Sequence, residues 1–152
     1  MELQFREAVD ADLTALVQML GQDMLGAQRE DLSTHTNQAY LAAFAAIKKD
    51  PNNELIVVEA DKQIVGMLQL TFIPYLTHIG SWRCLVEGVR IHSDFRGQGL
   101  GKQFFAWVIS RANTRGCKIL QLTSDKQRPD ALRFYEGLGF KASHEGFKMH
   151  LI

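Results

Sequence analysis

The residues best suited to chemistry lie in the segment Arg96–Lys102, which reads RGQGLGK. Three glycines at alternate positions leave the backbone bare, so that several N–H groups can point at one ligand. Arg96 and Lys102 add positive charge at its two ends. A helix that begins directly after such a loop offers unpaired N–H groups and the positive end of its dipole. The segment therefore predicts a phosphate or pyrophosphate site, the alternative being a tight turn without a ligand.

The spacing of these glycines does not fit the two common nucleotide-binding motifs. The dinucleotide fingerprint requires G-x-G-x-x-G, whereas the third glycine here comes one position early. The P-loop requires G-x-x-x-x-G-K-[ST], but Lys102 is followed by Gln103, and Arg96 stands where the first glycine should be. Neither motif is present, so the sequence does not indicate a site for NAD or ATP.

The elements that must position this loop follow from the hydrophobic pattern. Strands are expected at 3–8, 55–58, 64–72, 82–91, 119–123 and 147–152, with a hairpin turn at Asp61-Lys62. Helices are expected after a cap at Asp10, after a cap at Ser33 or Thr34, over 100–115 and from Pro129 to 138. The segment 82–123 is then strand, glycine loop, helix and strand, a crossover that pairs its strands in parallel. The chain is predicted to be an α/β protein with a mixed sheet and helices on its faces.

Size and composition limit the class of protein. The chain has 152 residues, 46% of them hydrophobic and 22% charged, which is typical of one globular domain over residues 1–152. Lys plus Arg and Asp plus Glu each number 17, so the basic excess of a nucleic-acid-binding protein is missing. Cys84 and Cys117 form no CxxC pair, and we find neither a signal peptide nor a membrane-spanning stretch. These features favour a cytoplasmic protein with two free thiols.

Two segments of the sequence resemble a known family. Val89-Arg90-Ile91, followed by Arg96–Gly101, is similar to the acetyl-CoA signature of the GNAT superfamily of N-acetyltransferases. Arg133–Phe140, which reads RFYEGLGF, resembles the later helix-loop element of that superfamily. The two segments stand at the family's usual separation, and the element order matches along almost the whole chain.

The resemblance also suggests a fold and, more loosely, a subgroup. A GNAT-like fold is a single α/β domain with a mixed, mostly antiparallel sheet, a parallel central strand pair and helices on both faces. The run 123–125 (TSD), with Arg128, Asp130 and Ala131, is similar to aminoalkylphosphonate N-acetyltransferases.

The resemblance implies acetyl-CoA as the cosubstrate. Its pyrophosphate would rest on the N–H groups of the glycine loop, and its pantetheine arm would run beside the strand that ends at Ile91. Strand geometry agrees, because Val89 and Ile91 are two residues apart and direct their backbone groups to the same edge. The residues expected to bind the cofactor are Val89, Ile91, Arg96, Gly97, Gln98, Gly99, Leu100, Gly101 and Lys102.

Acyl transfer to an amine needs a base, because an amine with the pKa of lysine costs about 4 to 5 kcal/mol to deprotonate at pH 7. Glu87 is the candidate, since it stands in an otherwise apolar strand beside the expected thioester. Burial there is expected to desolvate the carboxylate and raise its pKa toward a useful value. The family often has an acidic residue at this point, and water can relay the proton. The alternatives are a structural ion pair and a solvent-facing strand residue.

The departing thiolate of CoA needs a proton, and Tyr135 is the candidate acid. A phenol with a pKa near 10 stays protonated at neutral pH, and Tyr135 lies in the segment that resembles the family's tyrosine-bearing element. Core packing is the alternative role. The oxyanion of the tetrahedral intermediate would be met by a backbone N–H near Val89. Gly88 is expected to mark a strand bulge that frees such a group, or else a site of close packing.

The function that these residues predict is an acetyl-CoA-dependent N-acetyltransferase that acts on a small-molecule amine by direct attack. The alternatives are a CoA-sensing module without turnover and a nucleotide-binding regulator of nucleic acid, the latter disfavoured by charge and motifs. The acceptor pocket is expected to be built from the first two predicted helices and the segment 72–82. No metal ligands, nucleic-acid partner or membrane partner are expected, and the sequence leaves a homodimer open.

Overall fold

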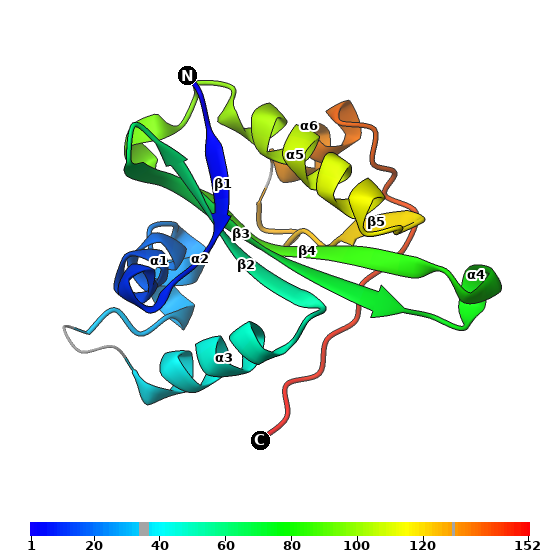
Figure 1. The fold of residues 1–152 in the computed structure, drawn as a ribbon, viewed down its shortest axis with the longest axis horizontal. Helices are drawn as coiled ribbons and strands as arrows, with labels where there is room; N and C mark the ends of the chain where they lie inside the picture. The colour runs from blue at the N-terminus through cyan, green and yellow to red at the C-terminus, as the bar shows by residue number, and fades with distance from the viewer. Residues whose placement is uncertain (34–36, 129) are drawn as a thin grey trace. The chain divides into compact units, whose positions relative to one another are not determined.

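A computed structural model describes residues 1–33, 37–128 and 130–152. Within them the chain forms two compact units, Met1–Gln121 and Leu122–Ile152. The first unit is built on a sheet with the strand order β1-β2-β3-β4-β5 (Figure 1). The single domain over residues 1–152 stays a prediction.

The sheet is mixed and mostly antiparallel, as predicted. β1 pairs with β2, β2 with β3 and β3 with β4 in antiparallel fashion, whereas β4 and β5 run parallel. The parallel pair lies at one end of the five strands. The strands are β1 (Gln4–Glu7), β2 (Asn53–Ala60), β3 (Gln63–Pro74), β4 (Trp82–Ile91) and β5 (Ile119–Leu122).

The helices include two short ones that the hydrophobic pattern did not predict, α2 and α4. Periodicity is a weak signal for them because each covers fewer than two turns. The α-helices are α1 (Leu13–Leu20), α2 (Met24–Arg29), α3 (Gln38–Lys49), α4 (Thr77–Gly80), α5 (Leu100–Thr114) and α6 (Ala131–Gly137). The described residues also contain two short 3-10 helices, η1 (Asp10–Asp12) and η2 (Ser93–Phe95). None of the helices in the described ranges is long and apolar enough to cross a bilayer.

Two of the expected helix caps are wrong. The carboxylate of Asp12, not that of Asp10, accepts a hydrogen bond from a backbone N–H at the start of the first helical segment, Val9 N–H at 2.8 Å. Asn37 rather than Ser33 caps α3, with its side-chain oxygen accepting from Ala39 N–H at 2.8 Å. Thr34 and Pro129, which we expected at helix starts, lie outside the described residues.

Helices cover both faces of the sheet. Side chains alternate along each strand, so each strand contributes residues to the packing on both faces. In β2, Leu55 and Val57 belong to the apolar cluster with α1 and α3. Glu54 points to the other face and meets Arg111 of α5. Figure 1 accordingly shows α1, α2 and α3 on one side of the sheet and α5 on the other. Phe104 of α5 is fully buried.

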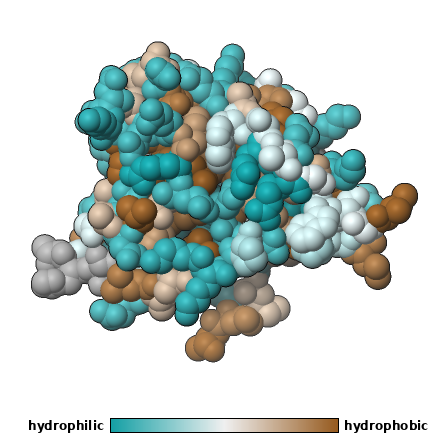
Figure 2. Space-filling view, viewed as in Figure 1, coloured by the Kyte–Doolittle hydropathy of each residue, from teal (hydrophilic) through white to brown (hydrophobic). Residues whose placement is uncertain are grey.

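The two hairpins of the sheet end differently. Asp61 and Lys62 both take positive φ angles, 49° and 65°, as the predicted two-residue turn between β2 and β3 requires. The turn between β3 and β4 contains α4, where Leu76 and Ile79 are almost fully exposed. Apolar side chains therefore form the tip that projects at the right of Figure 2, where α4 lies.

The strand predicted at 147–152 is wrong for this structure, since residues 141–152 form neither helix nor strand. A period-two pattern can form a strand only where another strand offers its edge. The described sheet ends at β5, and nothing extends it.

Candidate functional site

The glycine loop connects the end of β4 to the start of α5. Gly97 and Gly99 have φ angles of 76° and 75°, in the left-handed region that side chains disfavour. A Cβ atom at either position would meet no atom within 4 Å, so the backbone conformation, not crowding, requires glycine there. Gly101 has ordinary helical geometry within α5. The loop is exposed, and Leu100 anchors its end in the core with 1% exposure.

The first turn of α5 has the properties of an anion site. Gly99 is the N-cap residue and has no side chain with which to accept a backbone N–H. The N–H groups of the first turn therefore remain for solvent or a ligand. The turn contains no acidic residue, and Lys102 is exposed beside it. Arg96 folds back instead, with its Nε donating to the carbonyl of Ile91 at 3.2 Å.

The predicted bulge at Gly88 is confirmed. The register of β3 and β4 shifts between the pairs Met67–Arg90 and Gln69–Glu87, so β4 has one extra residue there. Gly88 takes a φ of 61°. An extra residue reverses which edge of the strand each later backbone group faces, because N–H groups alternate between the edges.

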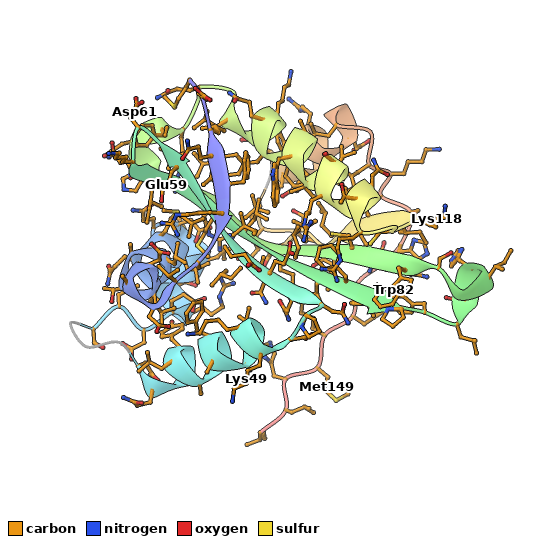
Figure 3. All side chains as sticks on the ribbon, in the orientation of Figure 1. Lys49, Glu59, Asp61, Trp82, Lys118 and Met149 are labelled. Atoms are coloured by element: carbon orange, nitrogen blue, oxygen red, sulfur yellow. The ribbon has the colours of Figure 1, made fainter. Side chains whose placement is uncertain are left out.

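The bulge turns one stretch of β4 toward an open edge. Before the bulge, the Trp82 carbonyl faces β5 and accepts from Lys118 N–H at 2.9 Å (both residues are labelled in Figure 3). After it, His92 N–H faces β3 and donates to the carbonyl of Val65 at 2.8 Å, so the N–H groups of Val89 and Ile91 face away from β3.

β5 is too short to cover this stretch. It ends at Leu122, and strands rise about 3.3 Å per residue, so it reaches only to about Val86 on β4. The carbonyl of Ile91 is bonded by Arg96, and that of Val89 accepts from Arg90 Nη1 at 2.9 Å. The edge therefore offers backbone N–H groups more readily than carbonyls to an incoming amide or oxyanion.

Glu87 lies one residue before the bulge and is exposed. The expected burial of this carboxylate is wrong, because the alternation of β4 turns Val86 into the core and Glu87 to solvent. The predicted solvent-facing alternative fits this position. Direct or water-relayed base catalysis stays a prediction.

Tyr135 lies in α6, in the second unit, whose geometry is described by itself. Its ring is half-buried and meets Phe134 and Phe140 edge-on, at centroid distances of 5.3 and 5.8 Å. Its carbonyl accepts from Leu138 N–H and Phe140 N–H, which closes the end of the helix. The packing expected as the alternative role is therefore present, and the proton-donor role stays a prediction.

The sequence analysis did not predict the charged group that Arg90 of β4 forms with Asp23 and Glu30, the residues at the two ends of α2. Arg90 is mostly buried, with a side chain only 12% exposed, and its Nη2 lies 4.0 Å from Asp23 Oδ2 at the start of α2. The Tyr40 hydroxyl donates to Glu30 at 2.8 Å. A single arginine between Val89 and Ile91, in a strand that is otherwise apolar there, was the available signal.

The carboxylate of Glu30 stays ionised at neutral pH. Burial raises the pKa of Glu30, but hydrogen bonds from Arg29 and Tyr40 outweigh it and hold that pKa below its ordinary value. The charge of Arg90 acts in the same direction. This part of the first unit thus presents both a guanidinium and carboxylates, which suits a ligand with charges of both signs.

The cysteines do not favour covalent catalysis. Burial is the main cause that raises the pKa of the Cys84 thiol to about 12, and burial also raises the pKa of Cys117. A thiol needs a lowered pKa to serve as nucleophile at neutral pH. Both cysteines are free.

Within the described ranges, no three His, Cys, Asp or Glu side chains gather in a way that could hold a metal ion.

The expected acceptor region is only partly assembled. Of the first two predicted helices, α3 contributes Tyr40 to the group that contains Glu30, whereas Asp23 and Glu30 flank α2, which was not predicted. The segment 72–82 runs out to the exposed tip at α4. Phe72 is buried in the core at 2% exposure. Figure 1 shows α4 at the opposite end of the sheet from α2. The segment beyond Pro74 therefore does not line the same place as α2.

Comparisons with known proteins agree with this geometry. The model of the Acetyltransferase (GNAT) family matches residues 17–140. Aminoalkylphosphonate N-acetyltransferase of Salmonella typhimurium is 33% identical over 110 residues, 72% of this chain and 71% of the relative. Glucosamine 6-phosphate N-acetyltransferase of Trypanosoma brucei brucei is 32% identical over 90 residues, 59% of this chain and 58% of the relative.

Solved structures match nearly the whole length of the chain. A crystal structure described as a transcriptional regulator from Bacillus halodurans is 59% identical, with a TM-score of 0.94 over 99% of this chain and 100% of that chain. A putative acetyltransferase from Agrobacterium tumefaciens is 26% identical, with a TM-score of 0.82 over 97% of this chain and 99% of that chain.

Proposed function

Because this chain belongs to the Acetyltransferase (GNAT) family, we propose that it transfers the acetyl group of acetyl-CoA to the amine of a small molecule by direct attack. One observation carries the proposal. The exposed N–H groups at the start of α5 follow directly on the stretch of β4 that the bulge turns to an open edge. The first suits a pyrophosphate, and the second suits the amides of a pantetheine arm.

The cofactor would bind in two parts. The loop from Gly97 to Lys102 receives the pyrophosphate, and the backbone of Val89 and Ile91 pairs with the pantetheine arm. Arg96 Nε leaves the Ile91 carbonyl as the pyrophosphate arrives, which frees that carbonyl for an amide N–H of the arm. Arg96 would thereby connect the two halves of the cofactor site.

The chemistry needs three proton or charge steps. Glu87, exposed at the bulge, takes the proton of the attacking amine directly or through water. A backbone N–H at Val89 stabilises the oxyanion of the tetrahedral intermediate. The Tyr135 hydroxyl gives its proton to the CoA thiolate as the carbon–sulfur bond breaks. The products are the N-acetyl amine and free CoA.

We propose an acceptor that carries an amine together with a phosphonate or phosphate group. The names of the Salmonella and Trypanosoma relatives both describe such compounds. Arg90 beside Asp23 and Glu30 offers charges of both signs to such a compound. The free thiols fit a reducing compartment, so we place the reaction in the cytoplasm.

The deciding experiment measures CoA release with a panel of amines. We expect turnover with 2-aminoethylphosphonate or glucosamine 6-phosphate and a much lower kcat/KM with ethylamine or glucosamine, the matched amines without the anionic group. Equal rates for both members of each pair would contradict the acceptor class and leave the acetyltransferase intact. Acetyl-CoA binding without CoA release from any amine would favour the alternative, a sensing module.

A further inference from the structure

An open pocket lies within the first unit, on the face of the sheet that α5 covers. It is lined by residues of β1, of β2 and of the second half of α5 (Figure 1), and its volume is about 360 Å³. Small-molecule sites typically have volumes of about 300 to 1,000 Å³. Ser110 lines the pocket and lies about 15 Å along the helix axis from Leu100 at the start of α5. The pocket is therefore separate from the candidate cofactor site.

One wall of the pocket is aromatic. The Phe5 ring of β1 stacks on the indole of Trp107 in α5, with 4.6 Å between the ring centroids and 3° between the ring planes. Phe5 also meets the buried ring of Phe104 edge-on at 5.9 Å, which fixes the stacked pair to the core. Ile56 of β2, only 3% exposed, adds an aliphatic surface. These side chains suit the apolar body of a small ligand.

The two arginines that line the pocket already bind carboxylates. Arg111 donates to both carboxylate oxygens of Glu54. Arg6 binds the carboxylates of Asp12 and Glu59. Because these guanidinium groups are neutralised by their partners, they leave little attraction for an anionic ligand.

Glu7 of β1 is the lining residue whose charge is available. Within the described residues, its carboxylate forms neither a hydrogen bond nor an ion pair, although its backbone carbonyl accepts from Arg6 Nη1 at 3.2 Å. Glu7 is exposed, so a ligand can reach its carboxylate. The exposed hydroxyl of Ser110 can accept a further hydrogen bond in the same pocket. The pocket thus combines a carboxylate and a hydroxyl with an aromatic wall.

We propose that this pocket binds a small organic monocation, an amine whose ammonium group pairs with Glu7 while its aromatic or aliphatic body packs on Trp107. An ammonium group has three N–H donors, which suit the Glu7 carboxylate and the Ser110 hydroxyl. The apolar wall shields the pair from water and so strengthens its attraction. The residues proposed for catalysis and for cofactor binding do not line the pocket, so the site is independent of the proposed reaction.

Tryptophan fluorescence reports on this pocket directly. The chain has two tryptophans, so Trp82→Phe leaves Trp107 as the one indole. We expect 2-phenylethylamine, added without acetyl-CoA, to change the Trp107 emission in a saturable way. 2-Phenylethanol has the same ring without the charge and should bind more weakly by about tenfold or more. An emission that does not respond to the amine, or equal affinities for the two compounds, would overturn the proposal.

Glu7→Gln tests the carboxylate, because glutamine keeps the shape of the side chain and removes its charge. In the Trp82→Phe background, this change should weaken 2-phenylethylamine binding by about tenfold and leave 2-phenylethanol binding nearly unchanged. Asp61→Asn is the matched control, since Asp61 is exposed at the turn between β2 and β3 and does not line the pocket. It removes the same charge and should leave both affinities unchanged. Equal losses in the two variants would contradict binding at Glu7.

Thr114→Lys gives an independent test in which Glu7 stays intact. Thr114 and Glu7 line the same pocket, so the added ammonium group should pair with Glu7 and compete with 2-phenylethylamine. The matched control is Asn113→Lys, at the neighbouring exposed position that does not line the pocket, and it should leave binding unchanged. Circular dichroism checks that each variant folds. A folded Thr114→Lys variant that binds the amine as tightly as its parent would count against the proposal.

Discussion

Arg111 on α5 binds both carboxylate oxygens of Glu54 on β2, with Nε donating to Oε1 at 2.9 Å. The Glu54 side chain is only 8% exposed, and the pair raises the pKa of Arg111. Arg115 lies 3.7 Å from the same carboxylate, and its guanidinium stacks on Phe72 at 4.0 Å. This group fixes to the sheet the helix whose first turn forms the candidate cofactor site.

Replacing Glu54 by Ala should therefore destabilise the fold, because it leaves two guanidinium groups without their carboxylate. We expect a loss of about 2 to 3 kcal/mol in urea unfolding, below the range for a fully buried pair because the Arg111 side chain is 30% exposed. The double variant Glu54→Leu/Arg111→Leu should recover part of this loss. A single variant as stable as the wild type would show that the pair contributes nothing.

Asp12 should make the protein sensitive to acid. Hydrogen bonds from Arg6 at 2.7 and 3.0 Å are the main cause that lowers the pKa of Asp12. Its stabilisation is present above the unfolded-state pKa of about 3.9 and is lost as pH falls through the lower folded-state pKa. Asp12→Asn should cost about 1 to 3 kcal/mol at pH 7 and less at pH 2. Asp10→Asn, in the exposed pair with Lys48, is the matched control and should cost far less.

Acetyl-CoA should stabilise the protein, whereas NAD and ATP should not. At 100 times its Kd, acetyl-CoA should add about 2.7 kcal/mol, visible as a higher Tm. Gly99→Val should abolish this shift, because a branched side chain at this position would block the approach of the pyrophosphate to the backbone N–H groups of the loop.

Gly99→Ala and Gly116→Ala form a matched pair of control variants, since both glycines have φ near 75° and open surroundings. Both should lower Tm, but only the change at Gly99 should weaken acetyl-CoA binding, and equal shifts with ATP would refute the cofactor.

Tyr135→Phe should lower turnover while acetyl-CoA binding stays nearly intact. The change removes only the phenolic oxygen, so the edge-on contacts of the ring with Phe134 and Phe140 survive. Proton donation contributes about 10²- to 10⁴-fold to a rate. Single-turnover kinetics and calorimetric titration measure the two effects separately. A variant with the wild-type chemical rate would exclude Tyr135 as the acid.

Glu87→Gln should lower kcat/KM and remove the acidic limb of its pH profile, because glutamine keeps the shape of the side chain but cannot accept a proton. A slow acceptor is needed, so that chemistry limits the rate. If the limb persists in the variant, the titrating group is elsewhere. Changing to an acceptor of lower amine pKa then distinguishes the groups, since a limb that moves with the substrate belongs to the amine.

Local pattern was sufficient for much of this protein. The hairpin at Asp61-Lys62, the crossover from β4 through α5 to β5, and the bulge at Gly88 follow from residue types at fixed spacing. The conformation of each depends mainly on nearby residues, so the amino-acid sequence alone is enough to predict it. The resemblance of the loop from Arg96 to Gly101 to the family's signature could be recognised in the sequence for the same reason.

Tertiary structure decided what depends on distant partners. The exposure of Glu87 follows from which face of β4 the core occupies, and the place of Arg90 beside Asp23 follows from the packing of α2 against the sheet. Residues 147–152 have the pattern of a strand, but a strand exists only where another edge accepts its hydrogen bonds. A sequence records the preference of each segment, and only the folded chain decides which partner, if any, satisfies it.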